Sequence, residues 1–322
     1  GRDYALPYSG IWDFLESIEV VDDLTAFVTF SSPQHQQWGI FIYNRPVLPA
    51  HICGERSAEE LLGRNVNPIG TGAYQYLTHD QGRMVWQKRD EAYWAADVHG
   101  IDPKPTYIVD IVNGSNNVAL ALMLQGGMDL SNNFLPGIKD LLGGDFGLST
   151  FYPEVPYMLA ANTAWLAMDQ TEAPLDDPAF RKALAYSIDV PTIVSRVYGD
   201  IVSAASPTGL LPTWSQHVDQ AVVDELGFSY DPEMAMQILA DAGYVDNDGD
   251  GFVENLDGSP IDLEIIVPNG WTDWMESIRV IAQSGGDAGI KISTAFPDYT
   301  ARTDNLHAGN FDLAIVNDKP MS

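Results

Sequence analysis

The acidic run Asp246-Asn-Asp-Gly-Asp-Gly251 has the spacing of a cation-binding loop. Calcium loops of the EF-hand type need oxygen ligands at positions 1, 3 and 5, glycine at position 6, a backbone carbonyl at position 7 and a carboxylate at position 12. Counted from the first aspartate, the candidate ligands are Asp246, Asp248, Asp250, the carbonyl of Phe252 and Asp257. The spacing therefore predicts a calcium site that is structural, not catalytic.

This run departs from the loop pattern at its last position. Asp257 stands where glutamate is usual, and its shorter side chain makes bidentate closure around an ion harder. Glu254 lies nearby at position 9. A polar turn that binds no ion is the alternative, because aspartate and glycine also favour tight turns.

Two of the eight tryptophans lie in the run Pro268-Asn-Gly-Trp271-Thr-Asp-Trp274. This run follows a predicted strand and opens a predicted helix, and ligands of open α/β sheets bind beyond the carboxyl ends of the strands. Indole rings present flat apolar faces with an Nε1–H donor at the edge, which suits stacking on sugar rings. The predicted ligand contacts are Trp271, Trp274, Asp273 and Asn269. Packing in the core is the alternative for each tryptophan.

Charge and motif content exclude several classes of function. The chain has 16 Lys and Arg against 45 Asp and Glu, and its net charge of −29 repels phosphate backbones and anionic lipid. Its single cysteine, Cys53, cannot form an internal disulfide or a cysteine-based zinc site. The sequence contains no GxxxxGKS/T, GxGxxG or GxSxG motif. We therefore expect no nucleic-acid partner and no required cofactor, and we take binding without enzyme activity as the first interpretation.

Hydrophobic periodicity and turn residues predict a mixed-sheet α/β architecture. The first half contains predicted hairpins over 17–30 and 74–89, helices over 57–62 and 116–125, and strands over 107–112 and 128–130. The second half contains predicted helices over 179–188, from 191, and over 231–243, then strands 261–267, 290–295 and 311–316 alternating with helices 273–284 and 299–308. This alternation predicts a parallel sheet that is covered on both faces.

Four runs in a fixed order along the chain carry a resemblance to a known family. They are Asn67-Pro-Ile-Gly-Thr-Gly-Ala-Tyr74, Arg89-Asp-Glu-Ala-Tyr-Trp94, Gly126-Gly-Met-Asp-Leu130 and Pro174-Leu-Asp-Asp-Pro-Ala-Phe-Arg-Lys-Ala-Leu-Ala-Tyr-Ser-Ile-Asp189. Together they resemble the peptide/nickel-type extracellular solute-binding proteins of ABC importers, the family-five class. The resemblance covers nearly the whole chain.

The resemblance implies a two-lobed periplasmic-binding-protein-like fold with mixed α/β sheets. Members are commonly longer, so the chain is expected to be truncated at both ends. The implied domains are the end of a small extra domain over 1–65, lobe one over 66–157 and an incomplete lobe two over 158–322, with a hinge near Leu159–Asn162. The implied function is the capture of an oligosaccharide or oligopeptide for an ABC import system by hinge closure.

One departure from the family bears on the solute. Peptide-binding members often follow the strand that begins at Phe311 with a tryptophan and then an aspartate that holds the peptide's amino terminus, whereas this chain reads Ile315-Val-Asn-Asp318. Together with Trp271 and Trp274, this favours an oligosaccharide over an oligopeptide. Two other classes stay open: a glycoside hydrolase, which needs two carboxylates across a bond, and a calcium-organised structural or adhesion module.

The resemblance also implies partners and a location. The expected partner besides the solute is an ABC transporter permease, and the expected oligomeric state is a monomer. The expected location is extracellular or periplasmic. A lipid anchor, which is missing from this chain, is the expected means of any attachment to the membrane. No apolar run in the sequence reaches the length of roughly 18 residues that a bilayer span needs.

Overall fold

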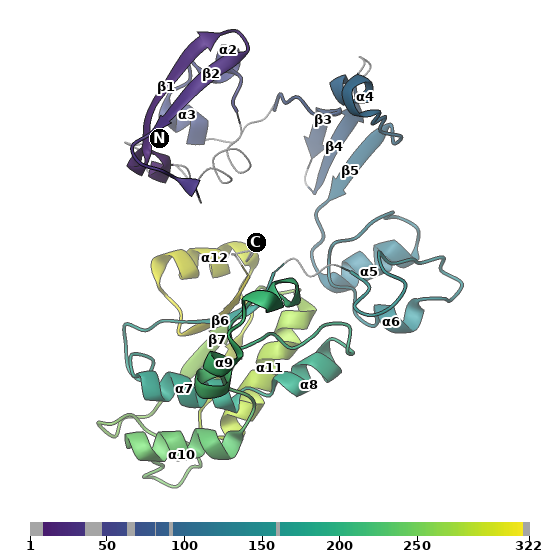
Figure 1. The fold of residues 1–322 in the computed structure, drawn as a ribbon. Coiled ribbons are helices and arrows are strands. Elements are labelled where there is room, and N and C mark those ends of the chain that lie inside the picture. Colours follow the sequence, from purple (N-terminus) through teal and green to yellow (C-terminus); the bar gives the residue numbers. More distant parts are fainter. Residues whose placement is uncertain are drawn as a thin grey trace. The chain divides into compact units, whose positions relative to one another are not determined.

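The computed structural model describes residues 9–35, 47–62, 68–80, 82–89, 93–158 and 162–317 (Figure 1). The chain divides into two compact units, Gly1–Val112 and Asn113–Ser322. The domain limits predicted from the sequence, 65/66 and 157/158, stay predictions. Residues 159–161, most of the predicted hinge, lie outside the described part of the chain.

A β-hairpin begins the first unit, as predicted for residues 17–30. After the short 3-10 helix η2 (Ser9–Asp13), β1 (Leu15–Asp22) pairs antiparallel with β2 (Thr25–Phe30). Asp22 stabilises the bend between the strands, because its carboxylate accepts the Leu24 N–H at 2.8 Å.

Two short helices follow this hairpin, α2 (Ala50–Cys53) and α3 (Ala58–Leu62). The start of α3 confirms the helix predicted from residue 57. The Ser57 N–H donates to Glu60 Oε2 at 2.8 Å, and the Glu60 N–H donates to Ser57 Oγ at 3.2 Å. This reciprocal pair is a capping box, which satisfies two backbone donors at the helix start.

A three-stranded antiparallel sheet follows in the first unit. Its strands are β3 (Tyr74–Asp80), β4 (Arg83–Lys88) and β5 (Tyr107–Ile111), and helix α4 (Trp94–His99) lies between β4 and β5 in the chain. The Arg89 guanidinium donates to the carbonyls of Gly70 and Gly72, and Trp94 Nε1–H donates to the carbonyl of Thr71 at 3.1 Å. These bonds join the runs 67–74 and 89–94, two of the four that carry the family resemblance. Both runs therefore stabilise the same turn.

A four-stranded mixed sheet forms the centre of the second unit (Figure 1). Its order is β6-β9-β7-β8, with β6 at Trp165–Met168, β7 at Leu263–Ile266, β8 at Ile292–Ala295 and β9 at Leu313–Val316. β7 is parallel to β8 and β9, which confirms the predicted parallel sheet, and β6 pairs antiparallel with β9. The sequence pattern does not predict β6, because it stands apart from the strand–helix alternation over 261–316 that predicts the other three strands.

Four helices at predicted positions accompany this sheet: α7 (Pro178–Ser187), α10 (Pro232–Ala242), α11 (Thr272–Asp287) and α12 (Tyr299–Ala308). Aspartates cap three of them, since Asp177, Asp231 and Asp298 each accept a backbone N–H of the first turn. Ile265 and Ile266 are 0% and 3% exposed. Successive strand residues point to opposite faces, so both faces of the sheet are covered, as predicted.

The second unit contains further helices: α5 (Asn116–Leu124), α6 (Ile138–Leu141), α8 (Val190–Thr192), the π-helix η3 (Ile193–Val197), the 3-10 helix η4 (Pro212–His217) and α9 (Gln220–Leu226). The helix predicted over 116–125 is confirmed by α5. The strand predicted over 128–130 is wrong, because these residues form a loop in which Leu130 is 85% exposed. These residues lack the burial that would favour a strand.

Helix α10 offers a matched test of the core, because one of its faces is buried and the other is exposed. We expect Leu239→Ala to lower the free energy of unfolding by about 2–5 kcal/mol, since Leu239 is 1% exposed and truncation leaves a cavity. We expect Met236→Ala to change it by less than about 1 kcal/mol, because Met236 is 46% exposed. Urea unfolding measures both, and equal losses would contradict the assignment of faces.

Candidate functional site

The strand order locates the place where the second unit can bind a ligand. The chain runs from β7 to β8 on one side of β7, and then returns past β7 to form β9 on its other side. The direction in which successive strands are added to the sheet therefore reverses at β7. In open α/β sheets ligands bind at such a reversal, outside the carboxyl ends of the strands. The residues that follow β7 at this carboxyl edge are 267–271. Asp318, which follows β9, lies outside the described residues.

Asn269 and Trp271 both lie at this carboxyl edge. The Asn269 side chain is exposed, and the backbone N–H of Asn269 donates to the carbonyl of Pro297 at 2.8 Å, which ties the segment after β7 to the segment after β8. The ring of Trp271 stacks on Tyr299 with centroids 5.9 Å apart and an interplanar angle of 26°. Tyr299 is 57% exposed. The pair forms an aromatic surface of the kind that binds the apolar faces of sugars.

Sequence reasoning did not identify Tyr299 as a candidate. The available signal is its place: Tyr299 begins the predicted helix 299–308 soon after the predicted strand 290–295, and Trp271 likewise lies between the predicted strand 261–267 and the predicted helix 273–284. Aromatic residues at equivalent positions after neighbouring parallel strands come together at the same edge of a sheet.

Trp274 has a different environment from Trp271. It is 6% exposed and belongs to the hydrophobic core, where its ring contacts Trp271 edge-to-face at a centroid distance of 4.9 Å. The Arg302 guanidinium lies 6.0 Å from its ring centroid. The structure thus gives Trp274 a packing role, and of the two indoles only Trp271 is a candidate for ligand contact.

The Asp273 carboxylate is partly buried and already holds two protein donors. Asn116 Nδ2 donates to Oδ1 at 2.9 Å, and the Tyr198 hydroxyl donates to Oδ2 at 3.3 Å. Burial raises the pKa of the Asp273 carboxyl above its ordinary value, while backbone N–H groups, Asn116 and Tyr198 oppose that rise. Burial, and next the charge of Asp273, raise the pKa of Tyr198, so its hydroxyl stays protonated and can donate. The predicted role of Asp273 as an acceptor for ligand hydroxyls therefore competes with these bonds.

Two cavities of about 410 Å³ each share part of their lining, and the first of them lies beside α11. Both are lined by η3 and by the segment 134–137, and α11 lines the first of them with Thr272, Asp273 and Glu276. The cavity next to α11 contains two cationic side chains, Arg196 and Arg279. The carboxyl edge thus adjoins space that water can fill.

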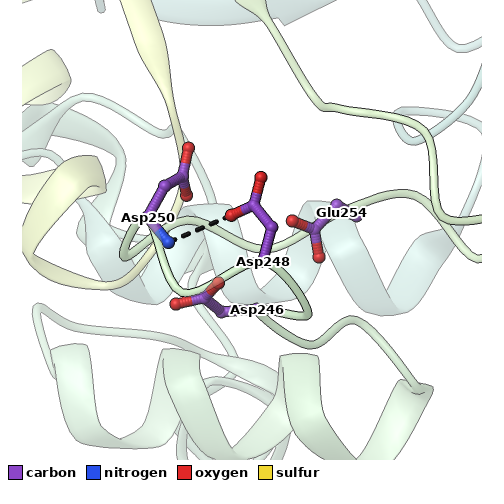
Figure 2. A group of neighbouring side chains, drawn as sticks. All are labelled: Asp246, Asp248, Asp250 and Glu254. Atoms are coloured by element: carbon purple, nitrogen blue, oxygen red, sulfur yellow. Dashed lines mark hydrogen bonds between the residues drawn. The ribbon is translucent and has the colours of Figure 1, made fainter.

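The acidic loop lies at the opposite, amino edge of the same sheet. The Val253 N–H donates to the carbonyl of Gly289, which precedes β8, and Glu254 forms a bridge with Pro260, which precedes β7. Carboxylate oxygens of four residues lie within 4.8 Å of one another: Asp246, Asp248, Asp250 and Glu254 (Figure 2). Three of these are exposed and Glu254 is buried. Hard oxygen donors at this spacing suit calcium.

Backbone hydrogen bonds hold the acidic loop in shape. Asp246 accepts the N–H groups of Gly249 at 2.7 Å and Gly251 at 2.9 Å, and Asp248 accepts the Asp250 N–H at 3.0 Å, the dashed line in Figure 2. Glu254 Oε2 accepts the Asn247 N–H at 2.8 Å. These bonds bring the carboxylates together.

Of the predicted metal ligands, the Asp257 carboxylate is not part of this group, while the backbone of Phe252 bonds to one of its members. Asp257 accepts the N–H of Ser259 at 2.9 Å and its hydroxyl at 2.6 Å, and these bonds lower the pKa of the Asp257 carboxyl. Phe252 donates its N–H to Asp250 Oδ1 at 2.9 Å. Among the described residues, the carboxylate that joins the first three is Glu254 and not Asp257.

Comparison with known proteins gives consistent likenesses. A solved structure from Thermotoga maritima, a periplasmic oligopeptide-binding protein of an oligopeptide ABC transporter with bound mannohexaose, is 41% identical with a TM-score of 0.92, covering 98% of this chain and 59% of that one. The oligopeptide-binding protein AppA of Bacillus subtilis (strain 168) is 23% identical over 317 residues, which are 97% of this chain and 55% of AppA. The structure of AppA in complex with a nonapeptide has a TM-score of 0.83 at 20% identity, covering 98% of this chain and 61% of that one, and shows the fold alone.

These likenesses confirm the predicted fold class, the α/β fold of the periplasmic binding proteins. The chain spans 55–59% of the length of the first relatives it matches. The family model described as the bacterial extracellular solute-binding proteins, family 5 middle, matches residues 1–320. Because that match extends over almost all of the 322 residues, the chain belongs to family 5 of the bacterial extracellular solute-binding proteins.

Proposed function

We propose that this chain is part of the substrate-binding component of an ABC import system and captures an oligosaccharide without reacting with it. The observation that carries the proposal is the 41% identity and TM-score of 0.92 with a protein solved with mannohexaose. The exposed Tyr299 beside Trp271 at the carboxyl edge supports the same class of solute. An oligopeptide is the second candidate, because AppA was solved with a nonapeptide.

Capture by closure follows from the contacts that a solute makes. A solute held between two lobes makes contacts with both only in the closed form, so it selects that form over the open one. Trp271 and Asn269 are the proposed contacts on the carboxyl edge of the second unit. Neither supplies a nucleophile or an acid–base pair, which agrees with binding and not catalysis.

The proposed partners and location follow the family. The relatives named above are binding proteins, and the Thermotoga maritima protein is a periplasmic component of an ABC transporter. We place the present protein outside the cytoplasmic membrane as a monomer that delivers its solute to a permease, with a lipid tether as one means of attachment. None of the helices in the described ranges is long and apolar enough to cross a bilayer.

Calorimetry with variants at the two edges of the sheet tests the proposed site. We expect mannohexaose to bind the full-length protein and Trp271→Ala to raise its Kd at least about tenfold, because a stacked aromatic anchor is lost. Asp248→Asn, at the opposite edge, serves as the matched control and should leave the Kd unchanged. Heat from a nonapeptide but none from mannohexaose would overturn the choice of solute. Sugar cleavage would overturn the binding function itself.

We also propose that the acidic loop binds calcium as a structural ion. The specific observation in favour is the group of four carboxylates within 4.8 Å, which includes the buried Glu254. The proposed ligands are Asp246, Asp248, Asp250 and the carbonyl of Phe252, with Glu254 or Asp257 closing the site.

Melting curves with calcium or with chelator test the loop. Calcium at one hundred times its Kd adds about 2.7 kcal/mol to the free energy of unfolding, so we expect Tm to rise by about 5 °C or more. Asp248→Asn keeps an acceptor for the Asp250 N–H but removes a charge, and should abolish most of this rise. Comparing Glu254→Gln with Asp257→Asn identifies the closing ligand. A Tm that is the same with calcium and with chelator would remove the site.

A further inference from the structure

The segment 113–158 is attached to the sheet of the second unit without sharing its hydrophobic core. Among the described residues, that core takes all of its members from the range Leu166–Ile315. Helices α5 and α6 of the segment contribute none of them. Other contacts must therefore hold this segment in place.

The first attachment is polar and lies at the start of α5. The Asn116 N–H donates to the carbonyl of Gly270 at 3.0 Å, and its Nδ2 donates to Thr272 Oγ1 at 3.2 Å and Asp273 Oδ1 at 2.9 Å. The backbones approach closely, since a Cβ at position 270 would lie 2.6 Å from the carbonyl oxygen of Gly114. Asn116 itself is 6% exposed, so its amide depends on these partners.

The second attachment lies at the end of the loop between α5 and α6 and at the start of α6. Phe134 meets the ring of Tyr198 edge-to-face at 5.4 Å, and Lys139 Nζ donates to the carbonyl of Gly199 at 3.0 Å. The Tyr198 hydroxyl donates in turn to the second oxygen of Asp273. The Asp273 carboxylate therefore receives one donor from the segment and one from the sheet side.

The space between the two attachments is poorly filled. One cavity of about 410 Å³ lies between the segment and residues of η3 and α11, and a second of about 410 Å³ lies between the segment and residues 196–201. Interfaces that open and close are polar and loosely packed compared with a core. A carboxylate that loses water on docking gains little net free energy from its new hydrogen bonds, so the joint is close to balance.

We propose that the bond from Asn116 to Asp273 is a latch that holds the closed form and releases when the lobes part. The proposal rests on the proposed function and on the predicted domain limits, which put Asn116 in lobe one and Asp273 in lobe two, whereas the structure groups both residues in the compact unit Asn113–Ser322. Asp273 acts in this account on closure and does not touch the solute.

Hydrogen exchange at the amide of residue 116 reports the latch directly. This N–H is the first of helix α5 and has no partner inside the helix, so its protection depends on Gly270. We expect Asn116→Ala, measured in the full chain without solute, to speed exchange at this amide about tenfold. Tyr198→Phe is the matched control, because it removes a bond to the same carboxylate on the sheet side only, and should change it less than about twofold.

Two reference amides make every outcome decisive. The Val118 N–H bonds to Ser115 Oγ within α5 and reports helix fraying, and the Ile265 N–H lies in the central strand and reports global unfolding. Faster exchange at 116 alone supports the latch. Unchanged exchange at 116, or faster exchange at 265 as well, overturns it. Because the experiment uses no solute, its outcome can be interpreted even if the proposed solute does not bind.

Discussion

Burial of the central sheet on both faces is the constraint on which the second unit depends. Ile265, Leu313 and Ala314 are all 0% exposed, so the faces of β7 and β9 have no room for a ligand or an ion. Polar chemistry is confined to the two edges where the strands end. The carboxyl edge carries Asn269, Trp271 and the neighbouring Tyr299, and the amino edge carries the acidic loop. One buried scaffold thus keeps the solute candidate and the calcium candidate apart.

A second physical contrast separates what is permanent in this unit from what can move. The sheet and helices α7, α10 and α11 share a continuous apolar core, which is costly to open. The segment 113–158 is instead held by hydrogen bonds, one ring contact and a lysine, with cavities between. A binding protein that must release its solute needs a joint of this second kind.

The parts of the fold that were predictable from the sequence are those that carry a local signal. Helix α10 was predictable at both ends, because Asp231 caps its start and Gly243 adopts a φ of +94° after its end. β6 escaped prediction because it stands apart from the strand–helix alternation over 261–316, and its partner, β9, lies about 150 residues later in the sequence. The clustering of Asp246, Asp248 and Asp250 was readable from spacing alone, since the loop is local.

The candidate solute site was predictable only in part. Trp271 and Trp274 look alike in sequence, but the turn of the helix sends one to the edge and the other into the core. The partner of Asp273 is Asn116, 157 residues earlier, and no local pattern announces such a pair. Packing between distant segments decides these roles, and sequence periodicity does not encode it.

The central claim is that an unreacted oligosaccharide lies against the carboxyl edge of the β6-β9-β7-β8 sheet. A crystal structure of the full-length protein grown with mannohexaose tests this most directly. The account predicts an intact sugar chain with a ring against Trp271. Density for the sugar at the amino edge, or for a shortened product at any site, would contradict it.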